Sequence, residues 1–313
     1  MSPPKKHTME SADFGNAARQ MYVCVYASQV AGIVGMNRHK PVHEAFEQFW
    51  ERTDGESYHA ALGRAGRVTD DAELLRIMAT HDDVKALVDK SLQLQCDSSM
   101  HVAGEYGDAQ AALGTLDLDH GERKVVDGLL RKNLYTNFGT RHESDILAHV
   151  RGHLHIDART DDTFYKRRIG TVRVRDEDVP WFIGGKIDAI VDAPQRVVVE
   201  IKNRVNRLFY RIPPYEHVQL QTYLALVDAD EGLLVEAYRT DACIAPDLNA
   251  MRVSRDKTWD ADIVPRVAAV VGFLGRLLSD EKMQDAYMAS KRRSALITRL
   301  FPAAAPEFVD DSA

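Results

Sequence analysis

Cysteine is scarce in this chain, and long apolar runs are absent from its sequence. The three cysteines, Cys24, Cys96 and Cys243, are far apart in a chain of 313 residues. Their odd number favours free thiols in a reducing compartment and excludes a four-cysteine iron–sulfur site. No apolar run approaches the roughly 20 residues of a membrane span, and the first residues lack the apolar core of a signal peptide. We therefore expect an intracellular protein of the cytoplasm or nucleus, without a membrane partner.

Positive charge is also in deficit over the whole chain, but not everywhere along it. Forty Lys and Arg stand against 47 Asp and Glu, a formal net charge of −7, which by itself does not indicate a nucleic-acid-binding protein. Between residues 164 and 212, however, eleven basic residues outnumber six acidic ones. A phosphate backbone would therefore bind along this segment.

The part of this segment that ends at Lys202 predicts a β-hairpin. A turn that contains Pro194 joins two apolar, β-branched runs over residues 182–191 and 196–202. Because side chains alternate between the two faces of a strand, Glu200 and Lys202 point the same way from the second strand.

An Asp on the first strand and a Glu-x-Lys on the second form a constellation for metal-assisted hydrolysis. Asp188 and Glu200 supply the hard oxygen ligands that Mg²⁺ prefers. Lys202 would orient or activate water, or stabilise charge that develops on a phosphate. A solvated or salt-bridged hairpin can show the same pattern, so the flanking segments decide between the two interpretations.

Asp188 and Glu200-Ile201-Lys202 resemble the signature of the PD-(D/E)XK nuclease superfamily, with Ile187-Asp188 in place of the Pro-Asp pair. The resemblance implies an α/β fold in which helices flank a mixed central β-sheet, here with a helical N-terminal elaboration. It also implies Mg²⁺ or Mn²⁺ as the cofactor, held by Asp188, Glu200 and the backbone carbonyl of Ile201.

A capped helix and a basic turn are predicted near the N-terminus. Ser28 is a plausible N-cap for a short helix that ends at Gly35, and Arg38 and Lys40 lie in the turn before a second helix over residues 42–52. Such a helix N-terminus suits an anion, and an ordinary core helix–turn–helix is the alternative. The pattern resembles the N-terminal motif of λ-exonuclease-like and viral alkaline exonucleases. That resemblance implies that Ser28 helps to hold a 5′-phosphate, with Arg38 and Lys40 as further candidates by position.

A glutamate on another predicted helix is a candidate third carboxylate. Glu143 lies in a helix that begins near residue 138 and shares the apolar flank of Ile146 and Leu147. A carboxylate on such a flank is costly unless it is paired or metal-bound. The exonuclease family carries a Glu before the hairpin that completes the metal shell, and Glu143 matches it. An exposed Glu among other helix charges is the alternative.

The helix predicted from Pro213-Pro214 carries a glutamine and a tyrosine four residues apart. Gln219 and Tyr223 therefore lie on one face of this helix. They match the Gln-x-x-x-Tyr motif of the exonuclease branch, which implies that they support the catalytic site. Gln221 is offset by two positions and is the less favoured alternative.

Basic residues around the hairpin are candidate DNA contacts. The segment after the Glu-x-Lys strand interleaves arginines with aromatic residues, which suits a phosphate backbone; a solvated loop anchored by its apolar residues is the alternative. Arg204 and Arg207 fall where the resembling nucleases carry a phosphate-binding arginine. Lys186, two residues before Asp188, is a further candidate by position.

The domain organisation follows from composition and from helical periodicity. We predict a disordered tail (1–15), a single nuclease domain (16–300) made of a helical elaboration (53–137), a catalytic core (138–255) and C-terminal helices (260–300), and a frayed tail (301–313).

In their order, these motifs resemble the λ-exonuclease-like, YqaJ-type recombination nucleases. The family implies metal-dependent hydrolysis of duplex DNA from an end, 5′→3′, in recombination, repair or viral DNA processing. It also implies three partners: double-stranded DNA with free ends, a single-strand annealing protein, and further copies of the chain in a ring-shaped trimer. Two alternatives remain, a structure- or sequence-specific endonuclease of the same superfamily and a catalytically silent DNA-binding protein of the same fold.

Overall fold

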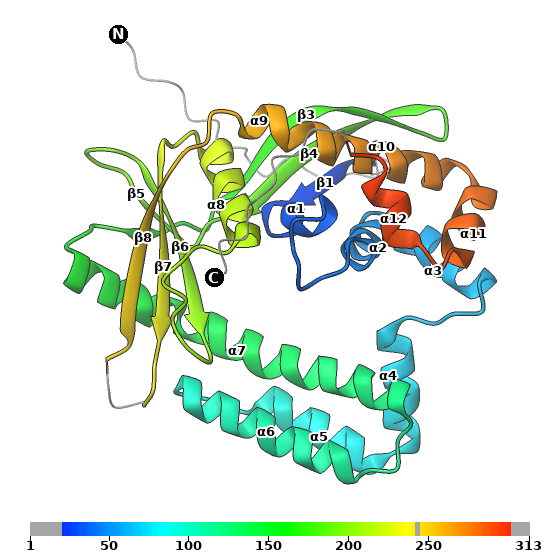
Figure 1. The fold of residues 1–313 in the computed structure, drawn as a ribbon, viewed down its shortest axis with the longest axis horizontal. Coiled ribbons are helices and arrows are strands. Elements are labelled where there is room, and N and C mark those ends of the chain that lie inside the picture. The colour runs from blue at the N-terminus through cyan, green and yellow to red at the C-terminus, as the bar shows by residue number, and fades with distance from the viewer. Residues whose placement is uncertain (1–20, 242–244, 302–313) are drawn as a thin grey trace, which may run out of the picture.

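The computed structural model describes residues 21–241 and 245–301, which form a mixed α/β fold (Figure 1). Helices and strands follow one another along the whole of this part of the chain. Their order is β1 (Val23–Tyr26), α1 (Ala27–Ile33), α2 (Val42–Thr53), α3 (Gly55–Arg64), α4 (Asp70–Thr80), α5 (Asp82–Gln93), α6 (Ser99–Thr115), α7 (His120–Leu154), β2 (Arg159–Thr160), β3 (Phe164–Val174), β4 (Glu177–Lys186), β5 (Ala189–Val191), β6 (Val197–Arg204), α8 (Pro214–Val227), β7 (Glu231–Tyr238), β8 (Asp247–Ser254), α9 (Trp259–Asp262), α10 (Val264–Ser279), α11 (Glu281–Ala289) and α12 (Arg293–Thr298).

The strands form two sheets. The five-stranded sheet has the order β2-β5-β6-β7-β8, and it is mixed because β6 and β7 are parallel while its other pairs are antiparallel. The three-stranded sheet has the order β1-β4-β3, with β1 parallel to β4. The five-stranded sheet is the mixed sheet that the sequence predicts.

Helices cover both faces of the five-stranded sheet. On one face, Val198 of β6 packs with Leu220 and Leu224 of α8. On the other face, Val199 and its neighbours pack against the C-terminal part of α7. Because β6 is buried on both faces, its sequence is a nearly continuous Val/Ile run.

The predicted hairpin is shorter than expected. Only Ala189–Val191 pairs with Val197–Val199; residues 182–186 belong to β4, which lies between β1 and β3 in the other sheet. The continuous first strand over residues 182–191 is therefore wrong. The chain changes sheets at residues 187 and 188, a change that β-propensity does not reveal.

The end of the helical elaboration predicted over 53–137 and the helix predicted from residue 138 are parts of one helix, α7, of 35 residues. A capping box fixes its first turn, in which the Asp119 side chain accepts from the Glu122 N–H at 2.8 Å. Gly139 does not interrupt it, because each half is held by a separate core. The first half packs on α4, α5 and α6, and the second half packs on β6.

The four helices α4–α7 contact the five-stranded sheet at the C-terminal end of β6. Ser99, the first residue of α6, donates its hydroxyl to the Arg204 carbonyl at 2.8 Å and its N–H to the Arg239 carbonyl at 2.7 Å. In Figure 1 these helices lie at the bottom, and α2, α3, α11 and α12 lie above them on the right. No helix among the described residues, α7 included, is both long and apolar enough to cross a membrane.

Candidate active site

Strand β6 presents two charged side chains to α8. Lys202 Nζ donates to Glu200 Oε1 at 2.7 Å and to Gln219 Oε1 at 3.2 Å. Gln219 Nε2 in turn donates to Glu200 Oε1 at 2.9 Å and lies 3.3 Å from the Tyr223 hydroxyl. Four of the predicted residues thus form one hydrogen-bonded group.

Asp188 reaches the same group from the point where the chain crosses between the sheets. Its Oδ2 accepts from the Ile201 N–H at 2.7 Å, on the residue between Glu200 and Lys202. This bond continues the pairing of β5 with β6 beyond Ala189, with a side chain in place of backbone. The N–H and C=O of a strand residue project to the same edge, so the Ile201 carbonyl projects to the side on which Asp188 lies.

Glu143 approaches from α7, on the other face of the sheet. The helix is held there by Ile146, Leu147 and Val150, which pack on β6, and by Asn203 Nδ2, which donates to the Gly139 carbonyl at 2.8 Å. Burial raises the pKa of the half-buried Glu143, and the charge of Glu200 raises it further. Glu143 therefore lies within electrostatic reach of the β6 pair.

The carboxylates of the group compete for positive charge. Burial raises the pKa of Glu200 to about 7 and that of Asp188 to about 6, although the charge of Lys202 lowers both. Burial alone would lower the pKa of Lys202, but the charge and hydrogen bond of Glu200 outweigh it and raise the pKa. More negative charge is gathered here than one ammonium group neutralises, a property typical of cation-binding sites.

The carboxylates fit a divalent cation in one specific respect. Glu200 Oε2 is buried and has no hydrogen-bond partner among the described residues, which is costly for a carboxylate oxygen unless a cation completes its surroundings. Within residues 21–241 and 245–301, no group of three His, Cys, Asp or Glu side chains is gathered closely enough to form a metal site. The site contains the carboxylates of Asp188 and Glu200, and the unpartnered oxygen belongs to Glu200. Glu143 is a third acid, close enough for the charge of Glu200 to raise its pKa.

Helix α1 lies against the same site through a close backbone approach. A Cβ atom on Gly185 would lie 2.7 Å from the Tyr223 ring and 3.1 Å from the Ala27 Cβ. Only glycine allows this contact between β4, α8 and α1. The first turn of α1 is thus next to Tyr223.

The predicted cap of α1 is wrong, although the helix exists. Helix α1 begins at Ala27, its N-cap is Tyr26, and no side chain caps it. Ser28 is the second helical residue and is exposed. Arg38 is exposed in the turn before α2, where its Nε donates to His39 at 3.3 Å. The helix begins two residues earlier than a cap at Ser28 requires, because it follows directly on β1, whose last residue is Tyr26.

Arg204 does not face solvent as a DNA contact requires. It is 8% exposed, and its guanidinium donates to both oxygens of Glu216 at 2.7 Å and to Glu236 at 2.8 Å. The ring of Phe209 lies over it at 4.1 Å. The prediction of Arg204 as a phosphate ligand is therefore wrong: its charge is neutralised by two buried glutamates.

The other basic candidates are accessible. Arg207 is exposed in the segment after β6. Lys186, the last residue of β4, is exposed and pairs with Asp162 at 2.6 Å, and its charge lowers the pKa of both Glu143 and Asp188. Lys186 is therefore a candidate phosphate contact whose charge acts directly on two of the carboxylates, Glu143 and Asp188.

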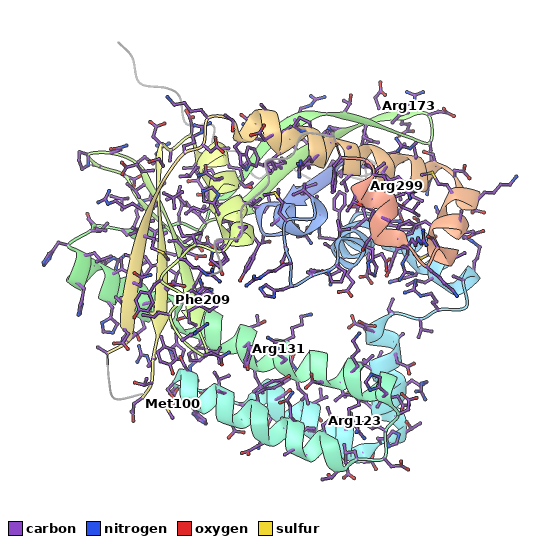
Figure 2. The ribbon with its side chains drawn as sticks, viewed as in Figure 1. Met100, Arg123, Arg131, Arg173, Phe209 and Arg299 are labelled. Atoms are coloured by element: carbon purple, nitrogen blue, oxygen red, sulfur yellow. The ribbon has the colours of Figure 1, made fainter. Side chains whose placement is uncertain are left out.

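Lys132, a lysine that the sequence did not single out, lies close enough to Lys40 for its charge to act on it. Burial lowers the pKa of Lys40, and the charge of Lys132 on α7 lowers it further. Arg131, the neighbour of Lys132 that Figure 2 labels on α7, lies over the Tyr135 ring at 5.6 Å, next to Tyr106 of α6. Helical periodicity could have placed residue 132 opposite the buried stripe of α7, but could not have placed it near the turn that holds Lys40.

The comparisons with known proteins are limited to solved structures. No protein-family model matches the chain, and no curated protein matches it. An alkaline exonuclease from Laribacter hongkongensis is 16% identical, with 57% of this chain and 93% of that chain covered and a TM-score of 0.34. A phage related exonuclease from Haemophilus somnus 129PT is 13% identical, with 50% and 72% covered and a TM-score of 0.30.

These likenesses are too distant to assign any residue or activity to this chain. The chain is an α/β protein with remote similarity to solved exonuclease structures, and the candidate site residues converge where β6, α8 and α7 meet.

Proposed function

We propose that this protein is a divalent-metal-dependent deoxyribonuclease that hydrolyses duplex DNA from an end in the 5′→3′ direction, in recombination, repair or viral DNA processing. One observation carries the proposal. Glu200, Lys202 and Gln219 form one hydrogen-bonded group on β6 and α8, Asp188 binds the Ile201 N–H beside it, and one oxygen of Glu200 is buried without a partner among the described residues. Isolated D…E-x-K patterns on solvated hairpins have no reason to bury such an oxygen.

The acids of this group are the proposed cation ligands. Asp188 and Glu200 would hold Mg²⁺ or Mn²⁺, together with Glu143 and the Ile201 carbonyl. When bound, the cation would stabilise negative charge on the scissile phosphate and activate water. The acids themselves fix its position, because Asp188 is held by the Ile201 N–H and Glu200 by Lys202 and Gln219.

Lys202 is proposed to act as a cation that positions water and stabilises charge on the phosphate. Its pKa is raised by Glu200, so the ammonium stays protonated and donates hydrogen bonds. Two of its donors are occupied by Glu200 and Gln219, which leaves the third for water or a phosphate oxygen. Gln219 and Tyr223 hold the other side of the group in place.

The proposed path of the DNA lies between α7 and the turn before α2. Lys40 and Arg38 lie on one side of this path, and Lys132 of α7 lies on the other. Ser28 at the start of α1, Lys186 at the end of β4 and the exposed Arg207 are the further proposed phosphate contacts. Such a distribution neutralises a backbone without reading bases.

Two assemblies are part of the proposal through resemblance alone. The related nucleases form ring-shaped trimers and work beside a single-strand annealing protein inside cells. Light scattering of the purified protein tests the first expectation, and a trimeric mass would support it. Co-purification with an annealing protein from the same genome tests the second.

The deciding experiment compares two substrates of the same sequence. The protein is incubated with Mg²⁺ and either a linear duplex with 5′-phosphates or a covalently closed circle, with Lys202→Ala as the inactive variant. Lys282→Ala, an exposed lysine on α11, is the matched control. Loss of the linear form alone, slowed at least about 100-fold by Lys202→Ala, is the expected result.

The other outcomes identify the alternatives. Cleavage of the circle would replace the exonuclease with an endonuclease of the same site. No hydrolysis of either DNA with Mg²⁺ or Mn²⁺ would leave a DNA-binding role. Products labelled at the 5′ or 3′ end then give the polarity.

A further inference from the structure

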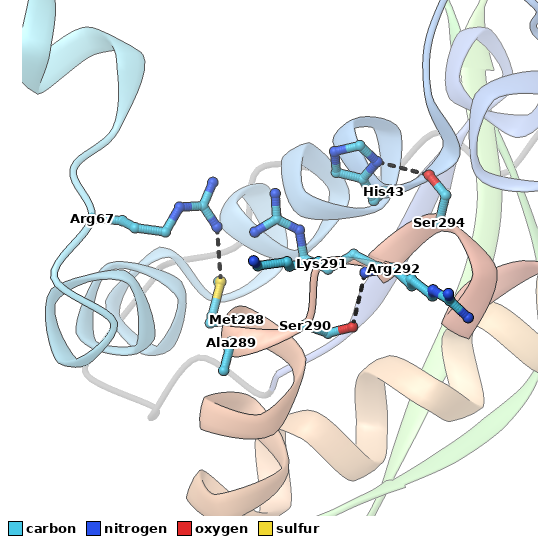
Figure 3. A pocket seen from close by; sticks show the side chains of 9 residues that line it. His43, Arg67, Met288, Ala289, Ser290, Lys291, Arg292 and Ser294 are labelled. Atoms are coloured by element: carbon cyan, nitrogen blue, oxygen red, sulfur yellow. Dashed lines mark hydrogen bonds between the residues drawn. The ribbon is translucent and has the colours of Figure 1, made fainter.

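A second cavity lies far from the carboxylates, where α2, α3, α11 and α12 meet. Its volume is about 370 Å³. The link between α11 and α12 forms one wall, the first turn of α2 another, and the chain that leaves α3 the third (Figure 3). In Figure 1 this corner lies on the opposite side of the molecule from β6 and β7.

The lining of the cavity is basic. It contains Arg67, Lys291, Arg292 and Arg293 together with His43, and no carboxylate from residues 21–241 or 245–301. In a chain with a net charge of −7, a cavity lined in this way is not explained by average composition. Figure 3 shows that Arg67 and Lys291 extend toward each other across the cavity.

Most of this positive charge has no ion-pair partner among the residues that the structure describes. Arg293 pairs with the buried Glu47 at 3.1 Å. Arg67, by contrast, has its Nη1 3.7 Å from the sulfur of Met288, a weak acceptor that offers no charge. Lys291 is exposed on the α11–α12 link. Two cations that face each other around a space repel, and an anion between them removes the repulsion.

Neutral donors complete the polar wall. The Ser294 hydroxyl lies 2.8 Å from Nδ1 of His43, and the Arg292 N–H is held by the Ser290 hydroxyl at 3.1 Å. The second bond fixes the link that carries Lys291. The cavity is thus built from positioned groups as well as from mobile side-chain ends.

The chemistry of the lining selects phosphate over base. Arginine and lysine are the side chains that bind phosphate oxygens. The lining has no Phe, Tyr or Trp, so it offers none of the large aromatic platforms on which nucleobases usually stack. Its volume is ample for a phosphate with its attached sugar.

We propose that this cavity binds phosphate groups of a DNA backbone, at a site separate from the carboxylate group on β6. That DNA is the source of the phosphate rests on the proposed function. The cavity then provides a second, sequence-independent contact on the side of the molecule opposite the hydrolytic site.

The test measures the salt dependence of DNA binding without hydrolysis. The affinity for a labelled duplex is followed by fluorescence anisotropy in Mg²⁺-free buffer at several NaCl concentrations. Arg67→Gln and Lys291→Gln should each weaken binding and reduce the slope of log K against log salt by about 1, and the double variant by about 2. Lys282→Gln, an exposed lysine on α11 outside the lining, should leave the slope unchanged.

Competition distinguishes the sources of phosphate. Inorganic phosphate and a 5′-mononucleotide are titrated against the duplex complex, and each should displace DNA only at millimolar concentrations. Tight binding of the mononucleotide that Lys291→Gln abolishes, with the duplex affinity unchanged, would overturn the DNA backbone as ligand. Unchanged slopes in Arg67→Gln and Lys291→Gln would overturn the site itself.

The outcome is separable from that of the proposed function. A reduced salt slope in the cavity variants of a protein that hydrolyses no DNA would support the phosphate site and contradict the nuclease proposal. Hydrolysis that Lys202→Ala abolishes, with unchanged salt slopes in the cavity variants, would support the nuclease proposal and contradict the phosphate site. Because Lys291 is exposed on a link between helices, Lys291→Gln alone keeps the test valid if Arg67→Gln fails to fold.

Discussion

At the scale of single residues, the two oxygens of Glu200 have different surroundings. Oε1 accepts hydrogen bonds from Lys202 and Gln219, while Oε2 is buried and finds no partner in the part of the chain that the structure describes. Gln219 uses both ends of its amide in this group, as a donor to Glu200 and as an acceptor for Lys202. Each residue of the group therefore fixes the direction of another.

The first prediction separates Gln219 from its neighbour Gln221. Gln219→Ala should lower kcat by about 10- to 100-fold, since Lys202 and Glu200 lose their shared partner. Gln221→Ala should leave kcat unchanged. It should instead lower the free energy of unfolding by about 1–3 kcal/mol, because Gln221 binds the Ser254 carbonyl and the Asp256 N–H. Steady-state kinetics and urea unfolding of both variants decide; equal kinetic effects would contradict the assignment.

The second prediction concerns metal removal. Mg²⁺ should raise the Tm of the wild-type protein, because a ligand that binds only the folded state stabilises it, and EDTA should reverse the rise. Glu200→Gln and Asp188→Asn should lose the Mg²⁺-dependent shift. Asp192→Asn, an exposed carboxylate on the β5–β6 turn, is the control and should retain it. A full shift in Glu200→Gln would place the cation elsewhere.

At the scale of elements, Arg204 connects three of them. It lies at the end of β6 and binds Glu216 of α8 and Glu236 of β7. Glu236 also accepts N–H bonds from Phe209 and Tyr210, which orders the chain after β6. The buried Arg204 therefore sets the position of α8, and α8 carries Gln219 and Tyr223.

The third prediction follows from this burial. Arg204→Ala should lower the free energy of unfolding by about 3–5 kcal/mol, because two buried glutamates lose their counter-charge. Arg207→Ala, three residues along and exposed, should change it by no more than about 0.5 kcal/mol and should weaken DNA binding instead. Urea unfolding and anisotropy of the two variants provide the measurement. A stable Arg204→Ala protein with weak DNA binding would restore the original prediction.

These elements also show what a sequence can and cannot predict here. Helical spacing of Gln219 and Tyr223 and strand alternation of Glu200 and Lys202 are local patterns, and they place these four side chains correctly. The partners of Arg204 lie 12 and 32 residues further along the chain, so nothing in the local pattern distinguishes a buried arginine from an exposed one. The change of sheet at residues 187 and 188 was missed for the same reason.

At the scale of the whole molecule, basic residues surround the proposed DNA path although the chain is acidic overall. Lys40 and Lys132 are 92 residues apart in the sequence, and the charge of Lys132 nevertheless lowers the pKa of Lys40. The four helices α4–α7 bring Lys132 close to Lys40. Without these helices, the five-stranded sheet would lack the positive charge of Lys132 on the second side of the proposed path.

The fourth prediction tests that arrangement. Lys132→Gln should weaken duplex binding by up to about tenfold at 0.1 M salt, since one fewer counterion is released. Lys85→Gln, an exposed lysine on α5 that pairs with Asp89, should bind as the wild-type protein does. Anisotropy titrations at constant salt compare the two. Equal affinities of the Lys132→Gln and Lys85→Gln variants for the duplex would contradict a DNA contact on α7.

Helix α7 joins a proposed DNA contact and a proposed metal ligand on one rigid rod. Lys132 and Glu143 are 11 residues apart, which corresponds to about 16 Å along the helix axis at 1.5 Å per residue. Because separate cores clamp both halves of the helix, this separation cannot stretch. The helix therefore fixes the distance between a phosphate bound at Lys132 and the proposed hydrolytic site at Glu143, and the number of helical residues between these two side chains sets that distance.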